Sequence, residues 1–206
     1  MGDARGWQST ATGHRYCKNV DCPDISSSRP QVTFAVYTPR WRTADIFTSK
    51  LDGTAVKHLT HTPDWVDRDP VFSPNGEWLA WSRRSTEGTK AQIMIMRADG
   101  THKRRITPNS ISAYQPDWSP GSGRLLFSTN RGLATIRTDG TRFVRWPIGG
   151  DSPAWAINGR RIAAVQDGGR CCDMVDVHAL NGSLLPMEWS FPAEYISNIS
   201  WQPLPL

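Results

Sequence analysis

The stretch that decides the fold is DPVFSPNGEWLAW, residues 69–81. Its two apolar runs, expected strands at residues 70–73 and 78–83, are joined by Asn75-Gly76, and glycine accepts the positive φ that a tight hairpin turn requires. The second run is apolar nearly throughout, which is typical of a strand covered on both sheet faces. Asp99-Gly100 then separates two more expected strands, residues 92–97 and 102–107. The sequence therefore predicts a four-stranded antiparallel unit that needs a partner on each face.

The same unit recurs along the chain. An aromatic residue closes a short polar stretch four times, at spacings of 46, 37 and 46 residues: Phe72, Trp118, Trp155 and Trp201. A turn glycine recurs with it, at spacings of 47, 40 and 42 residues: Gly53, Gly100, Gly140 and Gly182. Two independent markers with nearly the same period indicate a repeat protein. Four-stranded units that stack around an axis form a β-propeller.

The fold class that follows is all-β, a small propeller of about four four-stranded blades. The first copy has expected second, third and fourth strands at residues 32–37, 45–49 and 56–60, but no aromatic-Pro first strand. Residues 199–203 form an isolated first strand. We therefore expect this C-terminal strand to pair with the first blade and close the ring, which leaves no open sheet edge. The alternative is a piece of a longer array.

The predicted domain organisation has two parts. Residues 1–29 contain no repeat marker and few apolar residues, so they are expected to form an N-terminal tail. Residues 30–206 are expected to form the propeller domain.

The units resemble the TolB-type, WD40-like (PD40) propeller repeat. The resemblance rests on residues 69–81, on IMIMRADGTHKRRIT at residues 93–107 and on DIFTSKLDGTAVKHLT at residues 45–60, and it covers about residues 31–203. It implies a β-propeller and says little about activity. TolB-type propellers usually have six or seven blades and TolB carries a separate α/β domain, so a chain of four blades without that domain departs from the pattern.

Composition narrows the classes of partner. The net charge is +5 and the pI about 9.3, but the cationic pairs are scattered, which makes a nucleic-acid partner unlikely. No stretch approaches the roughly eighteen consecutive apolar residues of a membrane span. The first residues lack the apolar core of a signal peptide, so we expect a cytoplasmic location.

Few residues suggest catalysis. The motifs GxSxG, HExxH and GxGxxG and the P-loop are all missing, so we assign no catalytic residue and no cofactor and expect a protein that is not an enzyme. The histidines show no paired spacing, and no metal site is assigned. For the four cysteines, free thiols, disulfides and a shared metal ion all stay open: Cys17, Cys22, Cys171 and Cys172.

The candidate binding residues lie in the inter-blade loops that precede each first strand, since propellers bind ligands where these loops meet. Together they supply aromatic rings, carboxylates, a guanidinium and amide or hydroxyl groups, a mixture that suits a peptide or small polar ligand. The alternative is that these groups only satisfy strand ends and bind water. The candidates are Trp65, Asp67, Arg68, Asp69, Tyr114, Gln115, Asp151, Ser152, Tyr195 and Asn198.

The predicted function is a non-catalytic β-propeller scaffold that recognises a protein or peptide partner through this loop face, as part of a larger assembly. The alternative is a carbohydrate-active enzyme resembling the propeller-type polysaccharide lyases. Such sites need clustered histidines with a metal at the channel mouth, and only His61 lies near one of the loops. A third possibility is self-association of the repeat.

Overall fold

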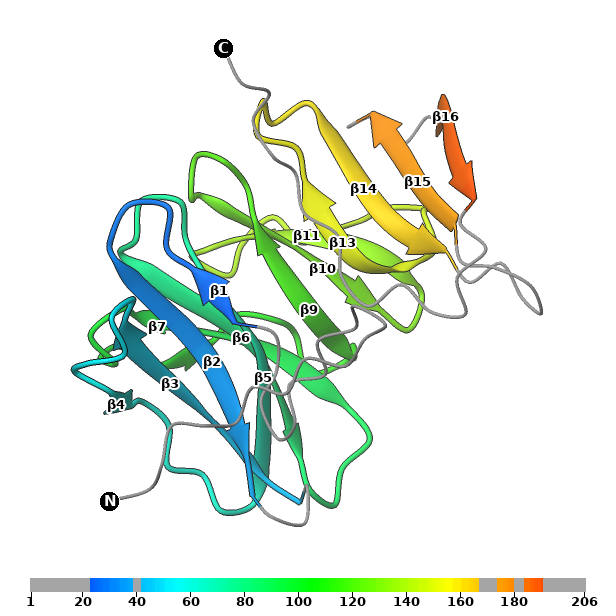
Figure 1. Cartoon of the computed structure of the whole chain (residues 1–206). Coiled ribbons are helices and arrows are strands. Elements are labelled where there is room, and N and C mark those ends of the chain that lie inside the picture. Colours follow the sequence, from blue (N-terminus) through cyan, green and yellow to red (C-terminus); the bar gives the residue numbers. More distant parts are fainter. Residues whose placement is uncertain (1–22, 39–41, 167–173, 180–183, 191–206) are drawn as a thin grey trace, which may run out of the picture.

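The computed structural model describes residues 23–38, 42–166, 174–179 and 184–190, and every regular element in these ranges is a β-strand (Figure 1). This confirms the all-β prediction. Within the described part there is no helix long and apolar enough to cross a membrane.

The strands form four antiparallel units of four, here called blades one to four in chain order. Blade one contains β1 (Asp24–Ile25), β2 (Gln31–Tyr37), β3 (Ala44–Lys50) and β4 (Lys57–His58). Blade two contains β5 (Trp65–Phe72), β6 (Trp78–Ser85), β7 (Ala91–Arg97) and β8 (Arg104–Arg105). Blade three contains β9 (Ala113–Trp118), β10 (Arg124–Thr129), β11 (Gly132–Arg137) and β12 (Val144–Arg145). Blade four contains β13 (Asp151–Trp155), β14 (Arg161–Gln166), β15 (Met174–Ala179) and β16 (Leu184–Ser190).

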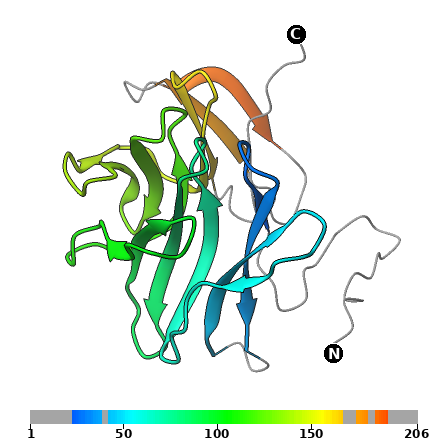
Figure 2. The same ribbon diagram turned by 90° about the vertical axis from the view of Figure 1, so that its left-hand side faces the viewer.

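The blades follow one another along an arc. A parallel bridge between Ala44 of β3 and Val66 of β5 joins blades one and two, and Figure 2 shows their strands side by side. Contacts between β5 and β9 and between β9 and β13 continue the series. Among the described strands, none of blade one contacts one of blade four, and the two lie at opposite ends of the arc in Figure 1.

Blade one has a first strand of its own, so the prediction that it lacks one is wrong. In β1, Asp24 pairs with Thr33 and Ile25 pairs with Val32 of β2. Aligned on Ser26 and Ser73, Ile25 takes the repeat position of Phe72 and Trp201. The aromatic marker does not predict this strand, because isoleucine stands at the marker position. The place beside β2 that ring closure assigned to residues 199–203 is thus held by β1, which belongs to the expected tail; residues 199–203 lie outside the described ranges.

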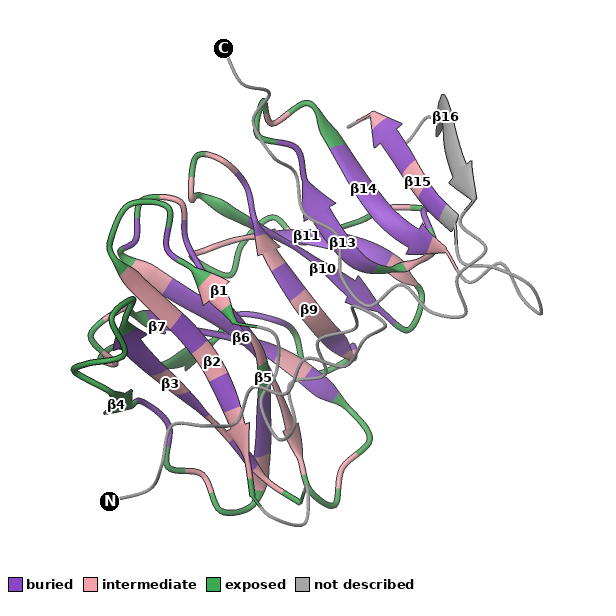
Figure 3. Cartoon of the chain, viewed as in Figure 1, coloured by how far each residue is buried: buried purple, intermediate pink, exposed green. Residues whose placement is uncertain are grey.

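The hydrophobic core lies between the blades rather than within one of them. Trp81 and Leu79 of β6 pack on Ala35 and Ile46 of blade one, and both are fully buried. Phe127 of β10 repeats this contact against blade two. Figure 3 shows buried residues running along β13 and β14, where the same packing continues.

The predicted aromatic anchors are confirmed as buried. Phe72 is 6% exposed and Trp118 is 4% exposed, each between two blades. The Trp118 indole Nε1 also donates to the carbonyl of Val71 in blade two at 3.2 Å. The marker therefore combines apolar burial with a bond between neighbouring blades.

The Asp-Gly-Thr marker forms a turn that satisfies its own polar groups. In three blades the aspartate Oδ1 accepts from the threonine N–H at 2.8–2.9 Å and from its Oγ1 at 2.6–2.7 Å; the aspartates are Asp52, Asp99 and Asp139. These bonds lower the pKa of each carboxyl. The central glycines have φ of 79°, 94° and 85°, which other residues rarely adopt.

Candidate functional site

The candidate binding residues that the structure describes lie within the first strands and not in loops before them. The strand expected to start at residue 70 begins at Trp65 instead. Residues 65–68 already pair with β6, and the pairing resumes beyond Pro70. Likewise Tyr114 and Gln115 belong to β9, and Asp151 and Ser152 belong to β13. Proline suggested a strand start because it lacks the N–H that a ladder needs. A β-bulge absorbs it instead.

The bulge recurs at one position in three blades. On the first strand two residues, the second of them proline, oppose one residue of the second strand. The residue before the proline has φ of 52° at Asp69, 53° at Gln115 and 47° at Ser152. A non-glycine residue rarely adopts this left-handed conformation, and bulges re-aim side chains where they occur. The bulge therefore takes these three polar side chains out of the regular alternation of their strands. They lie toward the end where the first strands begin, which is here called the entry end.

In blade two the candidates divide into one buried residue and several accessible ones. Asp67 is fully buried and receives Arg83 through Nε–Oδ1 at 2.6 Å and Nη2–Oδ2 at 2.7 Å. It stabilises the blade and is not available to a partner. Trp65 is half-buried beneath the Arg83 guanidinium, Arg68 is exposed, and Asp69 accepts from Ser82 Oγ at 2.5 Å.

In blades three and four the candidates form a cross-blade group. Gln115 Nε2 donates to Ser152 Oγ at 3.1 Å, and the Ser152 N–H donates to Gln115 Oε1 at 3.0 Å. Tyr114 is half-buried and Asp151 is exposed. Burial and the charge of Asp151 raise the pKa of Tyr114, and burial raises the pKa of Asp151. The predicted residues Tyr195 and Asn198 lie outside the described ranges.

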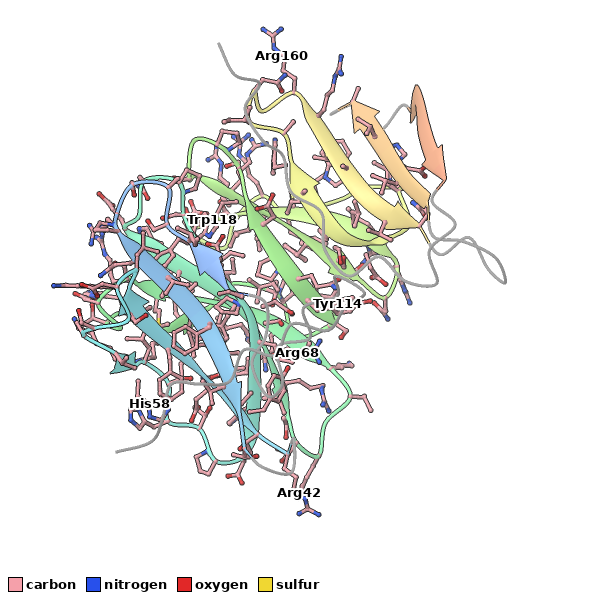
Figure 4. All side chains as sticks on the ribbon, in the orientation of Figure 1. Arg42, His58, Arg68, Tyr114, Trp118 and Arg160 are labelled. Carbon is pink, nitrogen blue, oxygen red and sulfur yellow. The ribbon has the colours of Figure 1, made fainter. Side chains whose placement is uncertain are left out.

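Three of the described candidate groups near the entry end are at least partly accessible to solvent. Arg68, Tyr114 and Asp151 come from three consecutive blades and offer a guanidinium, a phenol and a carboxylate. Figure 4 labels Arg68, and it labels Tyr114 and Trp118 at the two opposite ends of β9.

A cavity at that opposite end, here called the exit end, was missed by the sequence analysis. Its volume is about 340 Å³, and all four blades contribute to it through the ends of their first strands. The residues that line it include Asp24, Phe72, Asp117, Trp118, Trp155 and Ile157.

Asp24 and Asp117 hold the same position in the repeat and make the same bond. Asp24 Oδ2 accepts from the backbone N–H of Phe72 in the next blade at 2.8 Å. Asp117 Oδ2 accepts from the backbone N–H of Trp155 in the next blade at 2.5 Å. Blades two and four have Val71 and Ala154 at this position, so carboxylates alternate with apolar residues.

Burial changes the acidity of both carboxyls. Loss of solvation raises the pKa of Asp24 to about 6, and it raises the pKa of Asp117 to about 7, with a further contribution from the negative charge of Asp24. The backbone N–H bonds oppose these shifts but do not cancel them. In the sequence, the equivalence of the two aspartates is visible in the strings CPDIS and QPDWS, at residues 22–26 and 115–119, once Ile25 is aligned with Trp118.

Metal-ligating side chains do not gather in the described part of the chain: no group of three or more His, Cys, Asp or Glu residues is placed to hold an ion there. The four cysteines all lie outside the described ranges, so their state stays as left by the sequence. The His58 ring contacts the tilted ring of His61, with 3.8 Å between the centroids, and pairs with Asp45 at 2.9 Å.

No family model matches the chain. Two curated proteins show sequence similarity. The uncharacterised protein Atu1656 of Agrobacterium fabrum is 30% identical over 83 residues, which is 40% of this chain and 27% of that protein. The Tol-Pal system protein TolB of Acinetobacter baylyi is 30% identical over 59 residues, which is 29% of this chain and 13% of TolB. The matches thus span well under two-thirds of either relative.

Solved structures share the fold at low identity. TolB from Acinetobacter baumannii superposes with a TM-score of 0.62 at 15% identity, covering 91% of this chain and 48% of TolB. A nidogen/laminin complex gives 0.65 at 13% identity, covering 89% and 68%. An oligogalacturonate lyase in complex with manganese gives 0.62 at 12% identity, covering 83% and 54%. With the repeat markers and the four described blades, these similarities show that the chain has a β-propeller fold whose repeats are similar to those of TolB.

Proposed function

We propose that this protein is a non-catalytic propeller scaffold that recognises a protein or peptide at the entry end of its first strands, as part of a larger assembly. The observation that carries the proposal is that Arg68, Tyr114 and Asp151 hold the same position in β5, β9 and β13, directly before the bulge. Arginine and tyrosine are among the side chains that most often anchor protein interfaces. The TolB and nidogen/laminin similarities support this class of function as fold-level analogy.

Site-specific photo-crosslinking tests the proposal. A photoreactive residue at position 68 or 114 is expected to capture a discrete partner in the native host. The same residue at Val144, which is 50% exposed on the outer strand β12, is the matched control. Capture that is equal at 144, or missing at both entry-end positions, contradicts the proposal. We also propose a cytoplasmic location, which fractionation of the same cells tests.

The lyase alternative has fold similarity as its support, and the histidines argue against it. His58 and His61 lie on blade one beside Asp45 and Phe47, and not among the candidate residues of β5, β9 and β13. Incubation of the protein with oligogalacturonate and manganese is expected to release no unsaturated product. Formation of that product would establish the alternative.

Self-association has a separate support in blade one. Phe34 takes the repeat position of Trp81 and Phe127, which are fully buried against the preceding blade, yet Phe34 is only half-buried. A second copy packing on this face of β2 would extend the arc. The molar mass in solution should then exceed 23 kDa and fall to the monomer value in Phe34→Ser.

A further inference from the structure

We propose that the exit-end cavity binds an organic cation, an alkylammonium or guanidinium group, held by Asp24 and Asp117. This site is distinct from the entry end, which carries the proposed partner contacts. A lysine or arginine side chain of a peptide and a free amine share this chemistry.

The cavity has the size and the fixed geometry that such a site needs. Its volume of about 340 Å³ accommodates a side chain of the length of lysine together with water. Each carboxylate is oriented by a backbone N–H of the following blade, at 2.8 Å for Asp24 and 2.5 Å for Asp117. A ligand would therefore meet carboxylates already in place, which reduces the entropy cost of binding.

The charge inside the cavity is unbalanced. Among the described residues that line it, there are two carboxylates and no Lys, Arg or His. Burial without a counter-charge is what raises the pKa of these groups, to about 6 for Asp24 and about 7 for Asp117. A bound cation favours the ionised carboxylate, so binding should release a proton near neutral pH.

Apart from the two carboxylates the lining is mostly apolar, which suits the alkyl part of an organic cation. It includes Phe72, Trp118 and Trp155, which are at most 8% exposed. Calcium and manganese take about six or more oxygen ligands, whereas two carboxylates line this cavity. The lining therefore favours an organic cation over a metal ion.

Calorimetric titration of the full chain with butylammonium and methylguanidinium tests the proposal, with n-butanol as the neutral probe and calcium and manganese chloride as metal probes. Saturable binding of either cation is expected at pH 8, with affinity at least about 10-fold lower at pH 5.5, where both carboxyls are largely protonated. Equal binding of butanol, an affinity that does not change with pH, or preferential binding of a metal ion would each overturn the proposal.

Matched variants assign the binding to the cavity. Asp117→Asn keeps an oxygen for the Trp155 N–H but cannot ionise, and it should weaken butylammonium binding at pH 8 at least about 10-fold. Asp64→Asn removes the same charge from an exposed turn and should bind like the wild type. Asp24→Asn serves as the second variant if Asp117→Asn does not fold. Wild-type affinity in a folded cavity variant refutes the assignment.

Discussion

Asp117 should make the stability of this protein fall as the pH rises, opposite to the usual behaviour of a carboxylate. Its pKa is about 7 in the folded protein and about 3.9 in an unfolded chain. The folded state therefore holds more protons than the unfolded state between about pH 4 and pH 7. The stabilisation is fully present below the unfolded pKa and is lost as the pH passes through 7.

The magnitude follows from the difference in pKa. Three pKa units correspond to about 4 kcal/mol, the upper limit of what Asp117 removes from the free energy of unfolding between pH 4 and pH 8. Asp24, with a folded pKa of about 6, adds about 3 kcal/mol over a window that ends one unit lower. Asp117→Asn stays neutral at every pH, so it should be more stable than the wild type at pH 8 by about 2–4 kcal/mol and nearly equal at pH 4.5.

Urea denaturation followed by tryptophan fluorescence at pH 4.5, 6 and 8 gives these free energies by linear extrapolation. The control Asp64→Asn should track the wild type at all three values. A difference between Asp117→Asn and the wild type that stays constant with pH would refute the argument, because the buried carboxyl would then have an ordinary pKa.

Three further changes test the packing and the backbone. Trp118→Ala should cost about 3–5 kcal/mol in urea denaturation, since it empties the contact between two blades; near-wild-type stability would mean the indole is not a core element. Gly132→Ala should cost about 2 kcal/mol more than Gly53→Ala, because both have positive φ but only at Gly132 would a Cβ lie 2.4 Å from a backbone carbonyl; equal melting temperatures would contradict this. Gln115→Ala removes the side chain that accepts from the Ser152 N–H and should cost about 1–2 kcal/mol, measured by calorimetry; wild-type stability would contradict this.

The sequence predicted the repeat and the inner strands well, because these depend on local turn chemistry and on burial of both sheet faces. The strand expected at residues 92–97 is β7 (Ala91–Arg97), and the strand expected at residues 78–83 is β6 (Trp78–Ser85). The strand expected at residues 102–107 is shorter in the structure, where β8 is Arg104–Arg105. An outer strand pairs with a single neighbour within its blade, so local pattern says less about its length.

The candidate site was harder to predict because it depends on contacts between blades. The pairing of Gln115 with Ser152 joins residues 37 apart, and no local pattern announces it. In the sequence Asp67 is indistinguishable from a surface carboxylate, whereas in the structure it pairs with Arg83. Prediction of the exit-end cavity required the alignment of Ile25 with Trp118, and a search for an aromatic marker does not find an isoleucine.

The alternation of carboxylate and apolar residue on the first strands gives this protein a module of two blades. Excision of blade three alone would place Val71 before Trp155, whose N–H would lose its acceptor. Excision of blades two and three together would place Asp24 there and restore the bond. Shortening or lengthening this propeller by design should therefore succeed in pairs of blades, and the same arithmetic would have applied to any duplication that built it.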